Sequence, residues 1–378
     1  MKQILVFIGT RPEGIKMAPV IDALEKSPDM EPLVVSTGQH RELLQHVVDT
    51  FGIRVHHDLE VMAPNQGLAR LTARLMEKID ALLDEVRPDM ALVQGDTTTV
   101  MVAALACFYR HIPVGHIEAG LRTGNVQSPF PEEINRRLAS SLASLHFPPT
   151  TTSRDNLLRE GVDPTTITVT GNTVIDALHM EVERQRLPDV QRTIDSNLAK
   201  LLGGDWQERP SVLVTGHRRE NFGEGFDEIC DALSRLAQTF EDHEFIYPVH
   251  LNPNVQGPVY ERLGDLGNVS LIPPQGYSEF VALMGQSKLI VTDSGGVQEE
   301  APSLGKPVLV MRDTTERQEG IAAGTVILTG AKADNIVREV SELITDEAKY
   351  RRMAEAANPY GDGHASERIL GRVREFLA

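Results

Sequence analysis

The sequence has little cysteine. Only two of its 378 residues are cysteines, Cys107 and Cys230, and each falls in a predicted helix. Two such residues cannot form the dense disulfide framework that stabilises small secreted proteins. We therefore expect both side chains to be buried, reduced thiols rather than a disulfide or a catalytic pair.

Long hydrophobic runs are also missing. No apolar run approaches the ~20 residues that a membrane-spanning helix needs. The first apolar run, residues 4–9, is too short for the core of a secretory signal peptide, and no small-residue cleavage site follows it. Hydrophobic residues still make up 41% of the chain, which is ordinary for a globular protein and excludes disorder. The sequence predicts a folded, cytoplasmic protein.

Positive charge is scarce. The 37 Lys and Arg residues stand against 54 Asp and Glu residues, which gives a net charge of −17. This charge argues against nucleic acid and anionic membranes as partners. It does not exclude a phosphate ligand, because a local cluster of cations and helix N-termini can outweigh the overall sign.

Short apolar runs alternate with amphipathic segments along the whole chain. The first series of runs comprises residues 4–9, 32–37, 90–95, 113–120, 145–149 and 167–171, and the second comprises residues 211–216, 245–250, 269–274, 288–293, 307–311 and 325–330. Each run is apolar almost continuously, which is typical of parallel strands that are covered on both faces. The alternation predicts an α/β protein with right-handed βαβ units and doubly wound parallel sheets.

The length of the chain favours two domains, because it exceeds what one typical core holds. A polar stretch, residues 183–211, separates the two series of strands and predicts the junction. We predict a first Rossmann-like domain at residues 1–182, completed by residues 364–378, and a second at residues 205–363, with a cleft between them.

The end of the chain predicts a helix that packs against another element. Ser366 is the expected N-cap of this helix. Its apolar stripe is formed by Ile369, Leu370, Val373, Phe376 and Leu377.

The residues that follow each strand are candidate site residues, because ligands of doubly wound sheets bind at the carboxyl ends of the strands. After the first strand, "GTRPEGIK" places Arg11 and Lys16 at a Gly turn that opens a helix. The stretch is not the phosphate loop of a nucleotide triphosphatase, because Ile15 separates Gly14 from Lys16 and no Ser or Thr follows. The two cations are either ligands of an anion or solvated charges of a tight turn.

Three acids follow later strands of the first series. Asp96 comes after "MALVQG" and is either an N-cap or an acid of the site. Glu118 ends "PVGHIE", where a carboxylate is costly unless it is partnered, so structure alone explains it least. Glu132 and Arg136 lie in "PFPEEINRR", where Glu132 could simply favour a helix N-terminus.

Histidines and a glycine pair follow strands of the second series. His217, beside Arg218, and His250 stand at equivalent positions of adjacent strands, which favours a ligand site. Zinc is disfavoured, because no two ligands share the usual short spacing. Ser294, Gly295 and Gly296 open a helix where backbone N–H groups can meet phosphate oxygens.

Glu300 lies further along that helix. A carboxylate there does not suit phosphate, but it can accept hydrogen bonds from a ribose diol. Phosphate donors and a diol acceptor on one helix indicate a site for a nucleoside diphosphate.

The chain resembles a known family, the non-hydrolysing UDP-N-acetylglucosamine 2-epimerases, over nearly its whole length. The resemblance implies a two-domain fold like that of the B-type glycosyltransferases. The matching motifs occur in the family's order and are "GTRPEGIKMAPV", "QGDTTT", "GHIEAGLRTG", "SPFPEEINRR", "VTGNTVIDAL", "TGHRREN", "YPVHLNP", "TDSGGVQEEAPSLGKPVLVMRDTTERQEG" and "NPYGDGHAS".

The resemblance also implies an activity. It is the reversible interconversion of UDP-GlcNAc and UDP-ManNAc in a homodimer, without NAD or metal, for cell-surface polysaccharide synthesis. UDP is eliminated across C1–C2 to leave a glycal, and it returns after a proton reaches the opposite face of C2. Inverting C2 requires acid/base groups on both faces of the sugar, and holding UDP requires cations and N–H donors.

The resemblance assigns roles residue by residue. The acid/base residues are Asp96, Glu118 and Glu132, and His217 lies near the diphosphate. The residues that bind the UDP-sugar are Arg11, Lys16, Arg136, Ser294, Gly295, Gly296, Glu300 and Arg312. Arg218 and His250 match positions where some members bind a second UDP-GlcNAc as an activator. Glu42 and His46 depart from that pattern, because the family has glutamines in this helix.

Three alternatives remain at the level of sequence. A hydrolysing epimerase would share the architecture and release ManNAc and UDP. A glycosyltransferase of the same fold would need an acceptor groove and fewer acids. A UDP-sugar-binding regulator without turnover would not need the acids at all.

Overall fold

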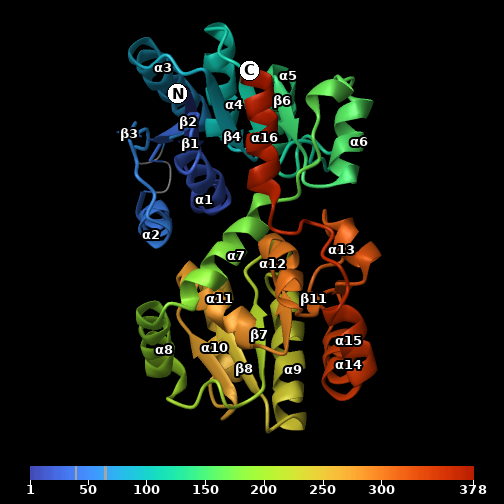
Figure 1. Cartoon of the computed structure of the whole chain (residues 1–378). Coiled ribbons are helices and arrows are strands. Elements are labelled where there is room, and N and C mark those ends of the chain that lie inside the picture. Colours follow the sequence, from blue (N-terminus) through green and yellow to red (C-terminus); the bar gives the residue numbers. More distant parts are fainter. Residues whose placement is uncertain (39–40, 64–65) are drawn as a thin grey trace. The chain divides into compact units, whose positions relative to one another are not determined.

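The structure is a computed structural model that describes residues 1–38, 41–63 and 66–378, and these form two compact units. The first unit comprises Met1–Ala177 and Tyr360–Ala378, and the second comprises Leu178–Pro359. Each unit is a parallel sheet covered by helices on both faces (Figure 1). The predicted α/β class with two Rossmann-like parallel sheets is confirmed.

Each sheet has six strands among the described residues. The strands of the first sheet are β1 (Lys2–Ile8), β2 (Met30–Ser36), β3 (His57–Asp58), β4 (Met90–Gln94), β5 (Val114–Ile117) and β6 (Leu145–Phe147). Those of the second are β7 (Ser211–Thr215), β8 (Glu244–Pro248), β9 (Val269–Ile272), β10 (Leu289–Thr292), β11 (Val308–Val310) and β12 (Val326–Leu328). The orders are β3-β2-β1-β4-β5-β6 and β12-β11-β10-β7-β8-β9, so the two units have the same topology.

One predicted strand was wrong and one short strand was missed. Residues 167–171 form no strand, and their one ladder contact is an isolated bridge between His146 and Ile167. The missed strand, β3, has two residues and therefore no apolar run that the sequence could reveal. The other predicted strands coincide with strands of the structure.

Helices connect the strands. Those of the first unit are α1 (Arg11–Glu25), α2 (Arg41–Phe51), α3 (Leu68–Glu85), α4 (Thr98–Tyr109), α5 (Glu132–Leu142), α6 (Thr151–Arg159), η1 (Pro164–Thr166) and α16 (Ala365–Leu377). Those of the second are α8 (Pro188–Leu202), η2 (Arg219–Asn221), α9 (Glu224–Thr239), α10 (Pro253–Leu263), α11 (Tyr277–Gln286), α12 (Gly295–Glu300), η3 (Ala301–Leu304), α13 (Gln318–Ala323), α14 (Ala333–Thr345) and α15 (Glu347–Ala354). The remaining helix, α7 (Thr173–Gln185), contains the boundary between the units.

Strand β1 shows how the first sheet is covered on both faces. Ile4, Val6 and Ile8 pack in one hydrophobic cluster with residues of α1, α2 and α16. Leu5 and Phe7 pack in another with residues of α3 and α4. Because successive side chains of a strand point to opposite faces, a continuous apolar run serves both clusters.

The C-terminal helix packs as its apolar stripe predicted, but its cap differs. Ile369, Leu370 and Val373 are buried in the cluster with α1, whereas Phe376 is 40% exposed. Ser366 is not the N-cap, because the helix begins at Ala365, which makes His364 the N-cap. The carboxylate of Asp176 in α7 accepts hydrogen bonds from the Ala365 and Ser366 N–H groups and from the Ser366 hydroxyl, and it satisfies this helix end.

The boundaries of the units differ from the predicted ones at their edges. The chain passes from the first unit to the second between Ala177 and Leu178, inside α7, and returns at Tyr360. Residues 183–204, which the prediction left as a linker, belong to the second unit. Their polar composition hides an amphipathic helix, α8, that buries Ile194 and Leu198 and packs on α11.

Within the described residues, none of the helices combines the length and the apolar composition needed to cross a membrane.

Candidate active site

The strand order of each unit reverses direction at one place. In the first unit this switch lies between β1 and β4, and in the second between β7 and β10. Connections from these neighbouring strands leave towards opposite faces of the sheet, so a crevice forms where their C-terminal turns diverge, and ligands bind there. Arg11 begins the helix that follows the first of these turns, and Asp96, His217 and Ser294 lie in the others. All four residues therefore lie at the C-terminal ends of strands that flank the two switches.

Glu118 directly follows β5 and has a left-handed backbone, with φ 64°. Side chains other than glycine rarely adopt this conformation, and it costs about 1–3 kcal/mol where it occurs. The carboxylate forms an ion pair with Lys16 of α1 and accepts hydrogen bonds from Gln94 Nε2 and, at 3.1 Å, from Asn172 Nδ2. The structure thus brings Glu118 and Lys16 together from elements 102 residues apart.

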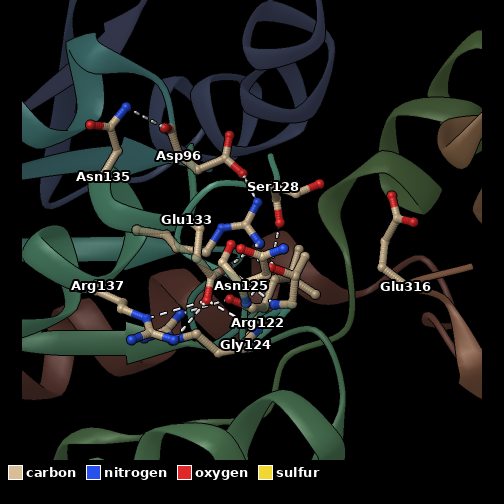
Figure 2. Close-up of polar contacts among 12 residues, drawn as sticks. Asp96, Arg122, Gly124, Asn125, Ser128, Glu133, Asn135, Arg137 and Glu316 are labelled. Atoms are coloured by element: carbon tan, nitrogen blue, oxygen red, sulfur yellow. Dashed lines mark hydrogen bonds and ion pairs between the residues drawn. The ribbon is translucent and has the colours of Figure 1, made fainter. Parts of the chain in front are cut away.

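Asp96 follows β4 and lies beside Arg136 of α5. The Arg136 guanidinium forms an ion pair with the Asp96 carboxylate. Asn135 Nδ2 donates a hydrogen bond to the Asp96 backbone carbonyl at 3.0 Å (Figure 2). Two successive residues of one helix therefore hold both the side chain and the backbone of Asp96.

Glu133 is the second carboxylate that contacts Arg136. Its carboxylate is completely buried and accepts hydrogen bonds from the Thr123 and Gly124 N–H groups and from Arg136 and Arg137 (Figure 2). Burial raises the pKa of Glu133, but the hydrogen bonds from Thr123 and Arg137 and the charge of Arg136 outweigh it and hold the pKa below its usual range.

Glu132, the neighbouring acid, is the first residue of α5 and is partly exposed. Its side chain makes no hydrogen bond or ion pair with the part of the chain that the structure describes. The structure therefore does not bring Glu132 together with Asp96 and Glu118 through any direct contact.

Glu13 is a site-supporting residue that the sequence analysis did not select. It lies in the first turn of α1 and is 3% exposed. Its Oε2 accepts hydrogen bonds from the Gly9 and Thr10 N–H groups at 2.7 and 2.8 Å, and its Oε1 accepts one from the Thr97 hydroxyl at 2.6 Å. Burial raises the pKa of this carboxyl, and the hydrogen bonds oppose the shift only in part. Thr10 and Glu13 form a capping box, whose sequence pattern could have identified the pair.

His116 contacts the turn that follows β4. Its ring is completely buried in β5, and Nε2 lies 2.7 Å from the Gly95 carbonyl, next to Asp96. Burial lowers the pKa of His116 to about 4, so the ring is neutral and Nε2 donates the hydrogen bond. This histidine fixes the turn that carries Asp96.

In the second unit, Asp293 directly follows β10 and joins the two turns of the switch. It is completely buried, and its Oδ2 accepts hydrogen bonds from the His217 and Arg218 N–H groups at 2.8 Å each. The His217 ring is stacked on that of His250, with 5.5 Å between the ring centroids. The pattern of two histidines at adjacent strand ends thus corresponds to a direct contact.

Helix α12 begins at the end of the same turn. Ser294 is its N-cap, with an extended backbone, and its side chain makes no capping hydrogen bond. Six residues on, Glu300 is 8% exposed, and its Oε1 accepts a hydrogen bond from the Tyr277 hydroxyl at 3.0 Å. The N-terminal N–H groups and the Glu300 carboxylate therefore lie on one short helix.

Gly295 has a structural reason to be glycine in addition to the predicted approach of a ligand. A Cβ atom at this position would lie 2.7 Å from Cζ of Arg317. The Arg317 guanidinium, which the sequence analysis missed, thus packs on the first turn of α12. At Gly296 the nearest atom would be Glu300 Oε2 at 3.6 Å, an ordinary contact.

Arg312 lies in a chain of alternating charges in the second unit. It pairs with Glu220 at 2.6 Å and with Glu316 at 3.0 Å, and Arg317 pairs with Glu316 at 2.7 Å and with Glu299 at 2.8 Å. Burial raises the pKa of Glu316, but the charges of Arg317 and Arg312 outweigh it and lower the pKa to about 2. Arg312 is therefore fixed in place by two carboxylates.

Two remaining expectations concern activators and metals. Arg218 is partly buried and His250 is exposed, and both follow strands of the second sheet. His46 is exposed on α2, and the side chain of Glu42 lies outside the described residues. No group of three or more His, Cys, Asp or Glu side chains that could hold a metal ion occurs among the described residues.

Comparison with known proteins gives one family. Residues 22–374 match the model of the family described as UDP-N-acetylglucosamine 2-epimerase. The chain belongs to this family. It is 55% identical over 374 residues to the UDP-N-acetylglucosamine 2-epimerase of Escherichia coli K12, which covers 99% of this chain and 98% of the relative.

Solved structures of the family have the same fold. The Neisseria meningitidis UDP-GlcNAc 2-epimerase bound to UDP-GlcNAc superimposes with a TM-score of 0.90 at 47% identity, over 99% of this chain and 100% of that one. The Methanocaldococcus jannaschii enzyme, in complex with UDP-GlcNAc and UDP, does so with a TM-score of 0.81 at 30% identity, over 99% and 100%. The family resemblance expected from the motifs is confirmed.

Proposed function

We propose that this chain is a non-hydrolysing UDP-GlcNAc 2-epimerase, an isomerase that interconverts UDP-GlcNAc and UDP-ManNAc. The observation that carries the proposal is Glu118. A carboxylate held in a left-handed backbone by Lys16, Gln94 and Asn172 is costly to build, and such costs are found mainly at functional sites. Membership of the epimerase family supports the same conclusion.

The reaction takes a proton from C2 of the sugar while the bond between C1 and the UDP oxygen breaks, which leaves a glycal and UDP. A proton is then delivered to the opposite face of C2, and UDP adds back to C1. Asp96, Glu118 and Glu132 are the proposed acid/base residues. Asp96 and Glu118 follow the neighbouring strands β4 and β5, and Glu132 begins α5.

Departing UDP needs positive charge and N–H donors. We assign this role to Arg11, Lys16, Arg136, His217, Arg312 and the turn Ser294–Gly296. Glu300 is assigned to the ribose hydroxyls, since its carboxylate lies on the helix that follows this turn. No metal ion and no nicotinamide cofactor enter the proposed steps.

We also propose a homodimer. Helices α4 and α5 pack together in the first unit and expose large apolar side chains. Phe108 and Tyr109 are 54% and 65% exposed, and Ile134 and Leu138 are 40% and 45% exposed. Apolar residues gathered on adjacent helices are typical of an interface between subunits. The proposed setting is the cytoplasm, where nucleotide sugars for surface polysaccharides are made.

The test is proton NMR of the purified chain with UDP-GlcNAc in D2O. The proposal expects UDP-ManNAc to accumulate to a steady ratio, with deuterium at C2 of both sugars. Release of free ManNAc and UDP would instead identify a hydrolysing enzyme with the same acids. No reaction without an added sugar acceptor would favour a glycosyltransferase.

A further inference from the structure

Only one of the two carboxylate oxygens of Asp293 accepts hydrogen bonds from the backbone. Oδ2 serves the His217 and Arg218 N–H groups, and Asn221 Nδ2 lies 3.4 Å from it. Oδ1 is buried and accepts no conventional hydrogen bond within the described part of the chain. It lies 3.3 Å from Nδ1 of His217. A buried carboxylate oxygen is costly to leave without a donor, and Nδ1 of His217 is the nitrogen that the structure brings to it.

Asp293 is the anion that contacts the His217 ring. Burial lowers the pKa of His217 most, and the charge of Arg218 and the stacked His250 lower it further. The Asp293 charge acts in the opposite direction. In the neutral ring, a proton on Nδ1 leaves Nε2, on the other edge of the imidazole, as a hydrogen-bond acceptor.

We propose that Asp293 is a positioning residue that fixes the Nδ1–H tautomer of His217 and so presents Nε2 to the ligand. The same carboxylate accepts hydrogen bonds from the backbone N–H groups of residues 217 and 218. One side chain therefore determines both the position of the imidazole ring and the nitrogen that carries its proton. In the elimination the protonated ring passes its Nε2 proton to the departing diphosphate and is left as the neutral Nδ1–H tautomer. In the re-addition Nε2 takes that proton back, and Asp293 stabilises the charged ring. This step rests on the proposed function, whereas the tautomer does not.

The Asp293→Asn variant makes the proposal testable. The amide oxygen must still accept from the two backbone N–H groups, because an amide nitrogen there would face two donors. The amide nitrogen then takes the place of Oδ1 and points its hydrogen at Nδ1 of His217. The variant is therefore expected to invert the tautomer and leave the proton on Nε2, with little change in the backbone.

The measurement is ¹H–¹⁵N correlation of the ring nitrogens in histidine-labelled full-length protein without ligand, at a pH where the ring is neutral. The His217→Gln variant assigns the signal. The proposal expects an Nδ1–H signal pattern in the parent chain and an Nε2–H pattern in Asp293→Asn. Asp242→Asn is the matched control, because the exposed Asp242 contacts Nδ1 of the buried His243 at 2.9 Å, and it must leave His217 unchanged.

An Nε2–H pattern in the parent chain would overturn the proposal, even if Asp293→Asn did not fold. So would an unchanged His217 pattern in a folded Asp293→Asn protein. The reaction supplies a second readout: we expect kcat to fall at least tenfold in Asp293→Asn and not in Asp242→Asn, and an inverted tautomer with unchanged kcat would refute the positioning role. If the parent chain shows the Nδ1–H pattern but no epimerisation, the proposed function fails and the assignment of the tautomer stands.

Discussion

The hydroxyl of Thr97 donates a hydrogen bond to the carboxylate of Glu13 at 2.6 Å, and this contact joins the turn after β1 to the turn after β4. The first turn precedes Arg11 and the second contains Asp96. A single buried acid therefore fixes the spacing of two turns at the switch of the first sheet. Asp293 does the same at the switch of the second, where it joins the ends of β7 and β10.

Replacing Glu13 by Ala should destabilise the protein by about 2–4 kcal/mol, because the Gly9 and Thr10 N–H groups and the Thr97 hydroxyl lose their acceptor in a buried place. Glu13→Gln should cost much less, since its amide can accept from both N–H groups and donate to the hydroxyl. Urea unfolding followed by circular dichroism checks both variants. Equal losses for Ala and Gln would contradict this account of the turn.

The stability of the parent chain and that of the Glu13→Gln variant should also depend differently on pH. The folded pKa of Glu13 is raised above 4.5, so its contribution to stability is complete below that pH and is lost as the pH rises through the folded value. Glutamine does not titrate. The stability of Glu13→Gln relative to the parent chain should therefore increase as the pH rises above about 4.5, which unfolding curves at several pH values would measure.

Glu133→Gln should show the opposite pH dependence. The folded pKa of Glu133 is lowered, so its contribution is present above 4.5 and is lost as the pH falls through the folded value. Near pH 7 the variant should be less stable by about 1–3 kcal/mol, since hydrogen bonds to a buried charge are lost. The difference should shrink in acid. Glu183→Gln, which alters an exposed ion pair with Arg186, is the control.

Glu118→Gln should abolish turnover, with kcat lower by about 10²-fold or more, and leave the affinity for UDP nearly unchanged. The reason is that the proposed role of Glu118 is on the sugar and not on the nucleotide. Turnover is followed by NMR and UDP binding by calorimetry. Glu183→Gln, which alters an exposed ion pair with Arg186, should keep full activity. A collapse of UDP binding in Glu118→Gln would mean that its role is wrong.

Glu300→Ala should weaken UDP binding about tenfold or more, because a ribose diol would lose its acceptor. Tyr277→Phe serves as a comparison, since it removes the hydroxyl that donates to Glu300 and keeps the carboxylate. We expect a smaller loss for that variant. Calorimetric titration with UDP decides the point, and an unaltered affinity in Glu300→Ala would exclude contact with the ribose.

Gly295→Ala and Gly296→Ala separate two explanations of the glycine pair. A methyl group at residue 295 would displace the Arg317 guanidinium, whereas one at 296 would meet ordinary contacts. If Gly295 serves only to accommodate Arg317, Gly295→Ala alone should lower the thermal stability, because the ion pair of Arg317 with Glu299 is disturbed, with little change in UDP affinity. If the ligand approaches the backbone closely, both variants should lose affinity. Titration of each variant with UDP distinguishes the two results.

The sequence predicted the strands well because parallel strands buried on both faces are continuous apolar runs. It failed where that rule does not apply. Strand β3 is too short to form a run, and residues 167–171 are apolar without pairing as a strand. Residues 183–204 were taken as a linker because a helix buried on one face has a polar composition.

The candidate site shows a similar limit. Glu118 and Asp96 could be selected because an acid at a strand end needs an explanation. Their partners could not, since Lys16 lies 102 residues from Glu118 and Arg136 lies 40 residues from Asp96. Glu13 and Asp293 escaped notice because each resembles an ordinary helix-end acid until its buried contacts are known. The roles assigned to individual site residues remain predictions.

The return of the chain to the first unit affects how the protein can fold during synthesis. Helix α16 supplies Ile369, Leu370 and Val373 to the core around β1, and its N-terminus is capped by Asp176. The whole second unit is translated between these two parts. On the ribosome, the second unit can therefore complete its fold while the first still exposes part of its core. The first unit, whose synthesis starts earlier, is then the later of the two to finish folding.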